Sequence, residues 1–251
     1  MTNSFMQAIL GAFCSVVFFA AVFFQSSVGS HSHTTRIIEG FSVRIDDRLL
    51  SGDGAVLGDR AIRLLFARLV AITFVVPEES LAKLRAVTIE LDLDCKDLMV
   101  MQYHPSALWL KANGYSEALA KCVHIPRVDD FLSPSENHRM PWVVLHELAH
   151  AYHDQVLSFD DPRVIGAWEK FVASGKYKSV LNSPGNTREH YGLTNAQEFF
   201  AEMSESYFGS NDFYPFVTGE LMQAEPLIYA LMVEIWGPLP QTLQPVAPVK
   251  K

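Results

Sequence analysis

One segment, residues 141–157, constrains the fold more than any other, because it reads PWVVLHELAHAYHDQVL. Apolar residues occupy nearly every side of it, which is typical of a helix buried in a protein core. Pro141 suits the first helical position, since the backbone N–H that proline lacks has no partner there. The sequence therefore predicts a core helix over 141–157, against which the rest of the chain must pack.

His146 and His150 stand four residues apart in this helix, with Glu147 beside them, in the pattern HExxH. Four residues make about one helical turn, so both imidazoles leave the same face and can bind one metal ion. Glu147 is turned about 100° from His146 and can hold a water molecule beside that ion. The alternative is a core helix that happens to carry two histidines, but buried His and Glu side chains are unfavourable unless something satisfies them. We therefore predict a zinc site.

A zinc site with chemistry at the metal needs a third protein ligand and an open position. The candidate segment is 195–208, NAQEFFAEMSESYF. A capping box of Thr194 with Gln197 marks its start and Gly209 its end, so we predict a helix. Three acids share one face of that helix: Glu198, Glu202 and Glu205. They could form a solvated stripe, but a neighbouring HExxH helix in need of a carboxylate favours Glu198 as the ligand.

Three other histidines are predicted not to bind this ion. His153 lies seven residues after His146, and a continuous helix rises about 10 Å over that interval, too far for one ion. No glycine follows His150 to break the helix. His104 and His124 stand at no recognisable ligand spacing, so we interpret both as surface histidines or as core histidines with ordinary partners.

Together the two motifs resemble the gluzincin metallopeptidases, in which HExxH is followed by a ligand glutamate on a second helix. Here HELAH is followed by Glu198 of NAQEFFAE, 48 residues after His150 (198 minus 150). This short second helix is most like that of the anthrax lethal-factor-like group. The resemblance covers residues 140–216. It implies a zincin-like α+β fold, one Zn²⁺ held by His146, His150 and Glu198, and hydrolysis of peptide bonds with Glu147 as the base.

The same resemblance implies roles for residues around the metal. Lethal-factor-like enzymes place a tyrosine seven residues before the ligand glutamate, where it assists the transition state, and Tyr191 stands there (198 minus 191). His190 is the alternative, because a histidine stabilises the oxyanion in other gluzincins, and packing of both residues in a loop is a further one. Gluzincins also place an acid one turn after the ligand glutamate, beside a zinc histidine, and Glu202 fits that position.

The front half of the chain predicts a small sheet packed on helices. Period-two alternation predicts strands over 37–45 and 87–93, where apolar residues of the second strand alternate with polar ones such as Glu90 and Asp92, and 121–125 could form another. Helical spacing predicts a helix from an N-cap at Asp59 to Pro77, followed by a short helix over 77–85.

No internal repeat or low-complexity tract divides residues 31–237, so we expect one domain there, followed by a Pro-rich tail over 238–251. Residues 6–24 are uncharged and almost wholly apolar, and we interpret 1–30 as a signal peptide or as an uncleaved membrane anchor. Both interpretations predict a secreted or extracytoplasmic protein. In that compartment Cys95 and Cys122 could form one disulfide or stay as two buried thiols.

The chain carries 20 basic and 28 acidic residues, a net charge of -8, which argues against nucleic acid or an anionic membrane as the main partner. We expect a peptide or protein substrate instead. Two other functions fit the same motif: a catalytically inactive protein that holds zinc on a peptidase fold, and metal-dependent hydrolysis of a non-peptide amide. Glu147 argues against the first of these, because a purely structural zinc site has no use for a base.

Overall fold

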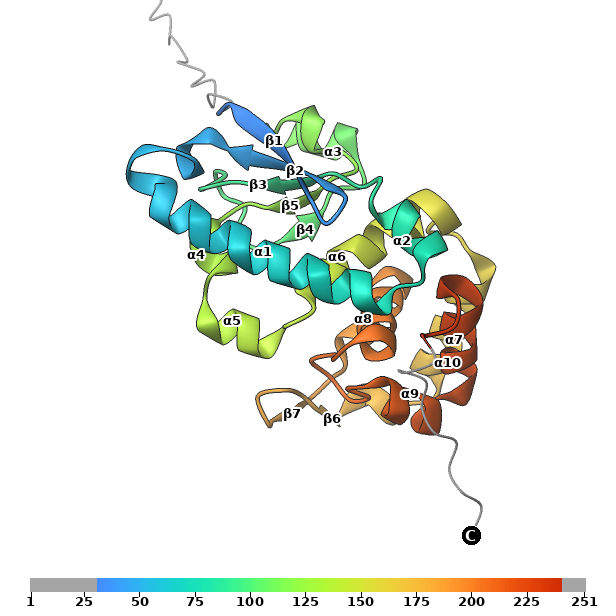
Figure 1. Ribbon diagram of the computed structural model, residues 1–251. Helices are drawn as coiled ribbons and strands as arrows, with labels where there is room; N and C mark the ends of the chain where they lie inside the picture. Colours follow the sequence, from blue (N-terminus) through green and yellow to red (C-terminus); the bar gives the residue numbers. More distant parts are fainter. Residues whose placement is uncertain (1–30, 241–251) are drawn as a thin grey trace, which may run out of the picture. The chain divides into compact units, whose positions relative to one another are not determined.

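The computed structural model describes residues 31–240, so the predicted signal or anchor over 1–30 and most of the predicted tail lie outside the described residues. Within 31–240 the chain is a mixed α+β unit with a small sheet and many helices, which confirms the predicted α+β class (Figure 1). None of the helices described is long and apolar enough to cross a membrane. Leu239 is buried, so the packed part of the chain extends past the predicted boundary at residue 237.

The main sheet has five strands in the order β1-β2-β3-β5-β4. Their bounds are β1 His33–Ile38, β2 Phe41–Asp46, β3 Ile89–Leu91, β4 Gln102–Tyr103 and β5 Val123–Ile125. β2, β3 and β5 run parallel, whereas β1 is antiparallel to β2 and β4 is antiparallel to β5. A second, two-stranded sheet pairs β6 (Val180–Leu181) with β7 (Thr187–Arg188). β4 is therefore an edge strand of the main sheet.

The strand predicted over 37–45 is wrong in its extent, because two strands meet inside it. Glu39 and Gly40 have φ values of 50° and 86°, and two successive positive φ values are typical of a type I′ hairpin turn. The alternation of Phe41, Val43 and Ile45 is confirmed, since all three are fully buried in β2. The dipeptide Glu-Gly lacks the Asn or Asp that usually signals this turn, so the sequence pattern does not predict the hairpin.

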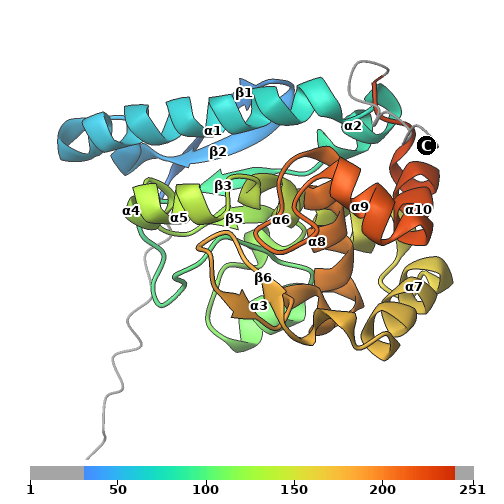
Figure 2. The ribbon, with the colours of Figure 1, turned by 90° about the horizontal axis from the view of Figure 1, so that it is seen from below.

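Helices make up most of the remaining described chain. Their bounds are α1 Ala55–Val75, α2 Glu78–Leu84, α3 Ala107–Ala112, α4 Val128–Phe131, α5 Pro134–Arg139, α6 Val143–Tyr152, α7 Pro162–Ala173, α8 Ala196–Phe208, α9 Thr218–Ala224 and α10 Pro226–Trp236. α6 and α8 pack against each other near the centre of the fold (Figure 2).

The start predicted for the first helix, an N-cap at Asp59, is wrong. α1 begins at Ala55, and Asp59 lies inside it, paired with Arg63 across one turn. The preceding turn packs directly on the helix, because a Cβ placed on Gly58 would lie only 1.9 Å from the backbone oxygen of Leu49. This close tertiary contact sets the helix start, and periodicity within the helix cannot reveal it.

The HExxH helix α6 begins at Val143, two residues later than the predicted start at Pro141. Trp142 is the N-cap, and its ring lies against the end of α8, where a Cβ on Gly209 would come within 2.1 Å of it. Gly209 ends α8, as predicted. A glycine is needed there for space, because any side chain would displace the tryptophan at the start of α6.

The two faces of the main sheet differ in chemistry. On one face Val43, Ile89 and Val123 stand in register across β2, β3 and β5. All three are fully buried, in the same hydrophobic core as Leu65 of α1. This apolar face and α1 form two layers, and the site described below lies beyond β4 at the sheet's edge.

On the opposite face the register aligns Arg44, Glu90 and His124. Although polar residues that alternate along a strand usually face solvent, Glu90 and Asp92 are buried, with exposed fractions of 7% and 6%. The segment between β3 and β5 crosses this face, and Arg44 donates a hydrogen bond of 2.9 Å to the carbonyl of Ala118 within it. A covered polar face cannot be told from an exposed one by alternation alone.

Beyond Tyr152 the backbone of α6 changes to a π-helical turn over His153–Leu157. His153 is fully buried there, and neither ring nitrogen has a hydrogen-bond partner. Its ring lies 5.2 Å from that of Phe159 and 4.9 Å from that of Phe200, measured between centroids. Burial lowers the pKa of His153 to about 4. His153 therefore packs in the core, away from the residue groups described below that could hold a metal ion.

We expect His153 to make stability fall as the pH drops. Its pKa is lower in the folded chain, so the unfolded chain binds more protons between pH 6.5 and pH 4, and stability decreases through that window. His153→Phe should reduce this loss by roughly 3 kcal/mol, the equivalent of about 2.5 pKa units. Urea unfolding at pH 7 and pH 4 measures it. His138→Gln, at an exposed position, is the control, and an unchanged pH dependence in His153→Phe would refute the expectation.

Candidate metal centre

α6 and α8 bring the three predicted ligands together. Glu198 Oε2 lies 3.2 Å from His146 Nε2 and 3.3 Å from His150 Nε2. One ligand atom from each residue lies within 4.8 Å of the other two, and all three side chains line one cavity. Two imidazoles and a carboxylate form a donor set that fits Zn²⁺ and leaves a fourth position open. The residues could thus hold a metal ion where the sequence predicted one.

Electrostatics keep Glu198 ionised, as a metal ligand must be. Although burial opposes ionisation, hydrogen bonds and charge interactions with His146 and His150 lower the pKa of Glu198 to about 2. Its position in the first turn of α8 is fixed by Asn195, whose side chain accepts a 2.8 Å hydrogen bond from the backbone N–H of Glu198. Asn195 is therefore the N-cap, and the predicted capping box of Thr194 with Gln197 is wrong.

The acid that hydrogen-bonds His146 is Glu205, which corrects the assignment of Glu202 to this position. Glu205 Oε1 lies 2.6 Å from His146 Nδ1, whereas the nearest Glu202 oxygen lies 3.9 Å away. Glu205 follows Glu198 by seven residues, which turn a helix about 20° less than two full turns. Glu202 follows Glu198 by four residues, which turn it about 40° more than one full turn. Glu205 therefore lines up better with Glu198 than Glu202 does.

Glu202 and Glu205 are nevertheless both part of the buried centre. Their exposed fractions are 2% and 3%, so the alternative of a solvated acidic stripe is wrong. Burial raises the pKa of Glu202 well above its usual value, and the neighbouring carboxyls of Glu205 and Asp212 add to the effect. Glu202 thus favours its neutral form beside the Glu205 that contacts His146.

This difference predicts unequal effects of two matched substitutions. Glu205→Gln should weaken zinc binding by about tenfold to a hundredfold, because it removes the anionic acceptor that orients His146. Glu202→Gln should change it much less, because the amide replaces a carboxyl that already favours its neutral form. Competition with a chromophoric chelator measures both affinities. A larger loss in Glu202→Gln would restore the assignment implied by the family resemblance.

Glu147 lies beside the three ligands and is held by the edge of the sheet. Its exposed fraction is 8%, and its Oε2 accepts a 2.7 Å hydrogen bond from the backbone N–H of Tyr103 in β4. Burial raises the pKa of Glu147, although the nearby His150 and His146 oppose the shift. A carboxylate with a raised pKa accepts protons more readily, which suits a general base.

The cavity around these residues has a volume of about 910 Å³. β4 and the segment before it form one wall, and residues from α4, α5 and the β6–β7 region form others. The lining includes Met99, Gln102, Phe131, Asn182, Arg188 and Phe213. A space of this size, with mixed apolar and polar walls and a group of possible ligands in it, is typical of a binding site for a small molecule or a peptide segment.

The structure separates the two oxyanion candidates. Tyr191 has an exposed fraction of 47% and lines the cavity with Glu147 and Glu198. His190 is 1% exposed, and its Nδ1 accepts a 3.0 Å hydrogen bond from the backbone N–H of Gly192, within the 3₁₀ turn Tyr191–Leu193. Burial lowers the pKa of His190 to about 3, so it stays neutral. His190 therefore caps the turn, and Tyr191 is the candidate that faces the cavity.

Within residues 31–240, His104, His124 and the two cysteines lie outside this centre. His104 Nε2 and His124 Nδ1 are 3.1 Å apart, both side chains are buried, and neither lines the cavity. Cys95 and Cys122 are both free thiols, so the structure contains no disulfide between them.

Comparison of the chain with protein-family models, with curated proteins and with solved structures finds no match. The candidate metal centre therefore rests on the geometry and donor chemistry of the residues themselves.

Proposed function

We propose that the chain is a zinc metallopeptidase with a zincin-like fold, as its resemblance to the gluzincins implies. The observation that carries the proposal is the position of Glu147, which lines the same cavity as the three-ligand group of His146, His150 and Glu198. A site that only held a metal ion would gain nothing from a buried carboxylate with a raised pKa beside it. Hydrolysis requires such a group to take a proton from water.

Zinc bound by the three ligands would polarise the scissile carbonyl and acidify a water molecule. Glu147 takes the proton of the attacking water and passes it to the nitrogen of the leaving amine. The Tyr103 N–H holds one oxygen of Glu147 and leaves the other for the water. Glu205 accepts the Nδ1–H of His146, so Nε2 keeps its lone pair on the side that faces Glu198.

A peptide fits this cavity better than another amide does. β4 is an edge strand, and Gln102 and Tyr103 in it line the cavity. Extended peptides bind such edges through backbone hydrogen bonds, and because Glu147 takes the N–H of Tyr103, the segment before it, which also lines the cavity, would supply them. A small non-peptide amide cannot extend along the strand in this way. We therefore propose a peptide or protein substrate and no nucleic-acid partner. We also propose that this activity lies outside the cytoplasm, which the apolar run over residues 6–24 supports.

Tyr191 is proposed to donate a hydrogen bond to the oxyanion. Removing one such donor typically lowers kcat by about 10²- to 10³-fold, so Tyr191→Phe should lower kcat with little change in KM. Tyr115→Phe, at a tyrosine stacked on Trp109 outside the cavity, is the matched control. His190→Ala should lower the melting temperature, because it removes a buried cap. Normal kcat in Tyr191→Phe would exclude the oxyanion role.

An unbiased peptide library incubated with wild type and Glu147→Gln tests the function itself. We expect cleavage by wild type only, its loss on chelation and its recovery when zinc is added back. Zinc-loaded wild type that cleaves no peptide would instead favour a zinc-holding binding protein. The cleavage positions in the library also distinguish endopeptidase from exopeptidase action.

A further inference from the structure

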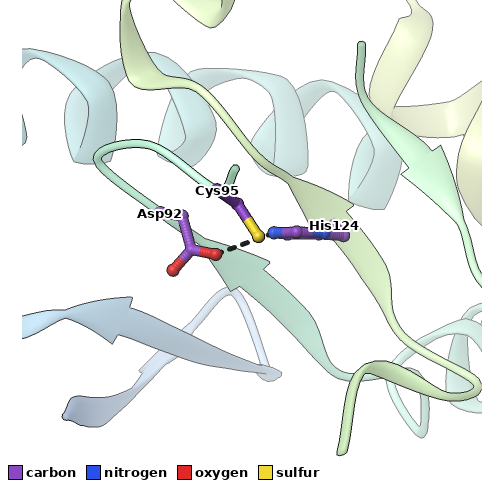
Figure 3. Close-up of side chains that lie close together, drawn as sticks. All are labelled: Asp92, Cys95 and His124. Carbon is purple, nitrogen blue, oxygen red and sulfur yellow. Dashed lines mark hydrogen bonds and ion pairs between the residues drawn. The ribbon is translucent and has the colours of Figure 1, made fainter. Parts of the chain in front are cut away.

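A second group of metal-ligand side chains lies on the polar face of the main sheet, apart from the candidate metal centre. Asp92 follows β3 directly, Cys95 lies in the next loop, and His124 is the middle residue of β5. One ligand atom from each lies within 4.8 Å of the other two. Figure 3 shows the carboxylate, the sulfur and the edge of the imidazole converging on one point. None of the three lines the cavity of the candidate metal centre.

The two ring nitrogens of His124 have the kinds of neighbours that a metal-binding histidine has. Its side chain is fully buried, and Nε2 lies 2.8 Å from Asp92 Oδ2. The other ring nitrogen, Nδ1, lies 3.1 Å from Nε2 of the buried His104. An imidazole nitrogen of His104 can accept a hydrogen bond from His124 at this distance. Ligand histidines characteristically donate their second N–H to such an acceptor.

Asp92 is also held from its far side. His33 Nε2 lies 2.6 Å from Asp92 Oδ1, while Oδ2 faces His124. The two oxygens thus have separate partners from β1 and β5, on either side of β3. These two contacts hold the Asp92 carboxylate with Oδ2 toward His124.

The surroundings of Cys95 carry an excess of negative charge. The carboxylates of Asp92, Glu90 and Asp94 all interact with its thiol. Arg44 pairs with Glu90, and Arg48 pairs with Asp94. The partners of Asp92 are two histidines, His33 and His124. A divalent cation at this point would replace the thiol proton and balance the remaining charge.

We propose that Asp92, Cys95 and His124 form a second metal site, for a thiolate-binding divalent ion of the Zn²⁺ class. Thiolate, imidazole and carboxylate together are zinc ligands, whereas Ca²⁺ and Mg²⁺ prefer oxygen alone. On binding, Cys95 releases its proton to solvent. The His124 proton is then carried on Nδ1, which donates to His104, and Nε2 becomes the ligand.

The site would connect the sheet to the cavity wall. It links the end of β3, the following loop and β5, and that loop leads within a few residues to Met99 and then β4, which line the cavity. A bound ion would therefore hold this wall in place. The proposal does not depend on the peptidase activity, because its three residues are not those of the candidate metal centre and its test measures bound metal instead of peptide cleavage.

Cobalt substitution of the full chain tests the second site. A Co²⁺–thiolate bond gives a charge-transfer absorption in the near ultraviolet, and the ligand group of the candidate metal centre, His146, His150 and Glu198, includes no thiol to produce it. We expect two Co²⁺ per chain and this absorption in wild type. Cys95→Ser should lose the absorption and one of the two ions, whereas His146→Ala should lose the other ion and keep the absorption.

The matched control removes the other two of the three cysteines in the chain. The double variant C14S/C122S leaves Cys95 as the sole thiol, and it should keep both ions and the absorption. Wild type without the absorption, or an absorption that survives Cys95→Ser, would overturn the proposal.

A measurement on wild type alone covers the case in which Cys95→Ser fails to fold. Alkylation of Cys95 by iodoacetamide, followed by mass spectrometry, should slow at least tenfold with zinc and recover when a chelator is added. Equal alkylation rates with and without zinc would also overturn the proposal of a second metal site.

Discussion

Glu147→Gln should lower kcat/KM for peptide cleavage by about 10²- to 10⁴-fold, the usual contribution of a general acid–base group, while fold and zinc content stay unchanged. The amide has the shape of the carboxylate, and its oxygen can still accept the hydrogen bond from the Tyr103 N–H. It cannot accept the proton of the attacking water. Glu147 is not one of the three ligand residues, so zinc should remain bound.

Kinetics on the best library peptide, with zinc measured on the same samples, check this expectation. Glu136→Gln is the matched control, because it makes the same change at another residue that lines the cavity. Full activity in Glu147→Gln with zinc bound would mean that another base acts, and the mechanism proposed above would be wrong. Loss of zinc together with activity would show that the substitution disturbs the ligands instead.

The sequence was sufficient to predict the helices that carry the centre and the ligands that they bring together. HExxH fixes His146 and His150 on one face of a helix by local geometry alone. The acidic face of α8 follows from the same periodicity. Helical spacing aligns Glu205 with Glu198 slightly better than Glu202, but which of the two acids reaches His146 also depends on how α6 and α8 cross. Glu205, rather than Glu202, reaches His146 Nδ1 for that reason.

Features set by distant parts of the chain could not be predicted in the same way. The polar side chains of β3 and β5 alternate as on any half-exposed strand, and only the segment crossing them makes Glu90 and His124 buried. The start of α1 depends on its contact with Leu49. The hydrogen bond from β4 to Glu147 joins residues 44 positions apart. In each case a tertiary contact decides a property that local pattern leaves open.

Glu198→Ala should remove the ion of the candidate metal centre and abolish hydrolysis. Glu198 is the charged ligand of the three, and its oxygen lies between the two imidazoles, within 3.3 Å of both. Substitutions of residues that only orient a ligand already cost about tenfold to a hundredfold in metal affinity, so loss of a ligand should cost more. His146 keeps its contact with Glu205, so the fold of α6 and α8 should persist.

Zinc per chain, measured after dialysis, gives the result directly. If both sites bind, wild type should carry two ions and Glu198→Ala one, and the remaining ion should still give the thiolate absorption with cobalt. Glu189→Ala, at an exposed glutamate of the segment before α8, should keep both ions. Undiminished zinc in Glu198→Ala would remove Glu198 from the centre. The carboxylate ligand would then have to be sought between Glu202 and Glu205, which form the other possible donor set with His146.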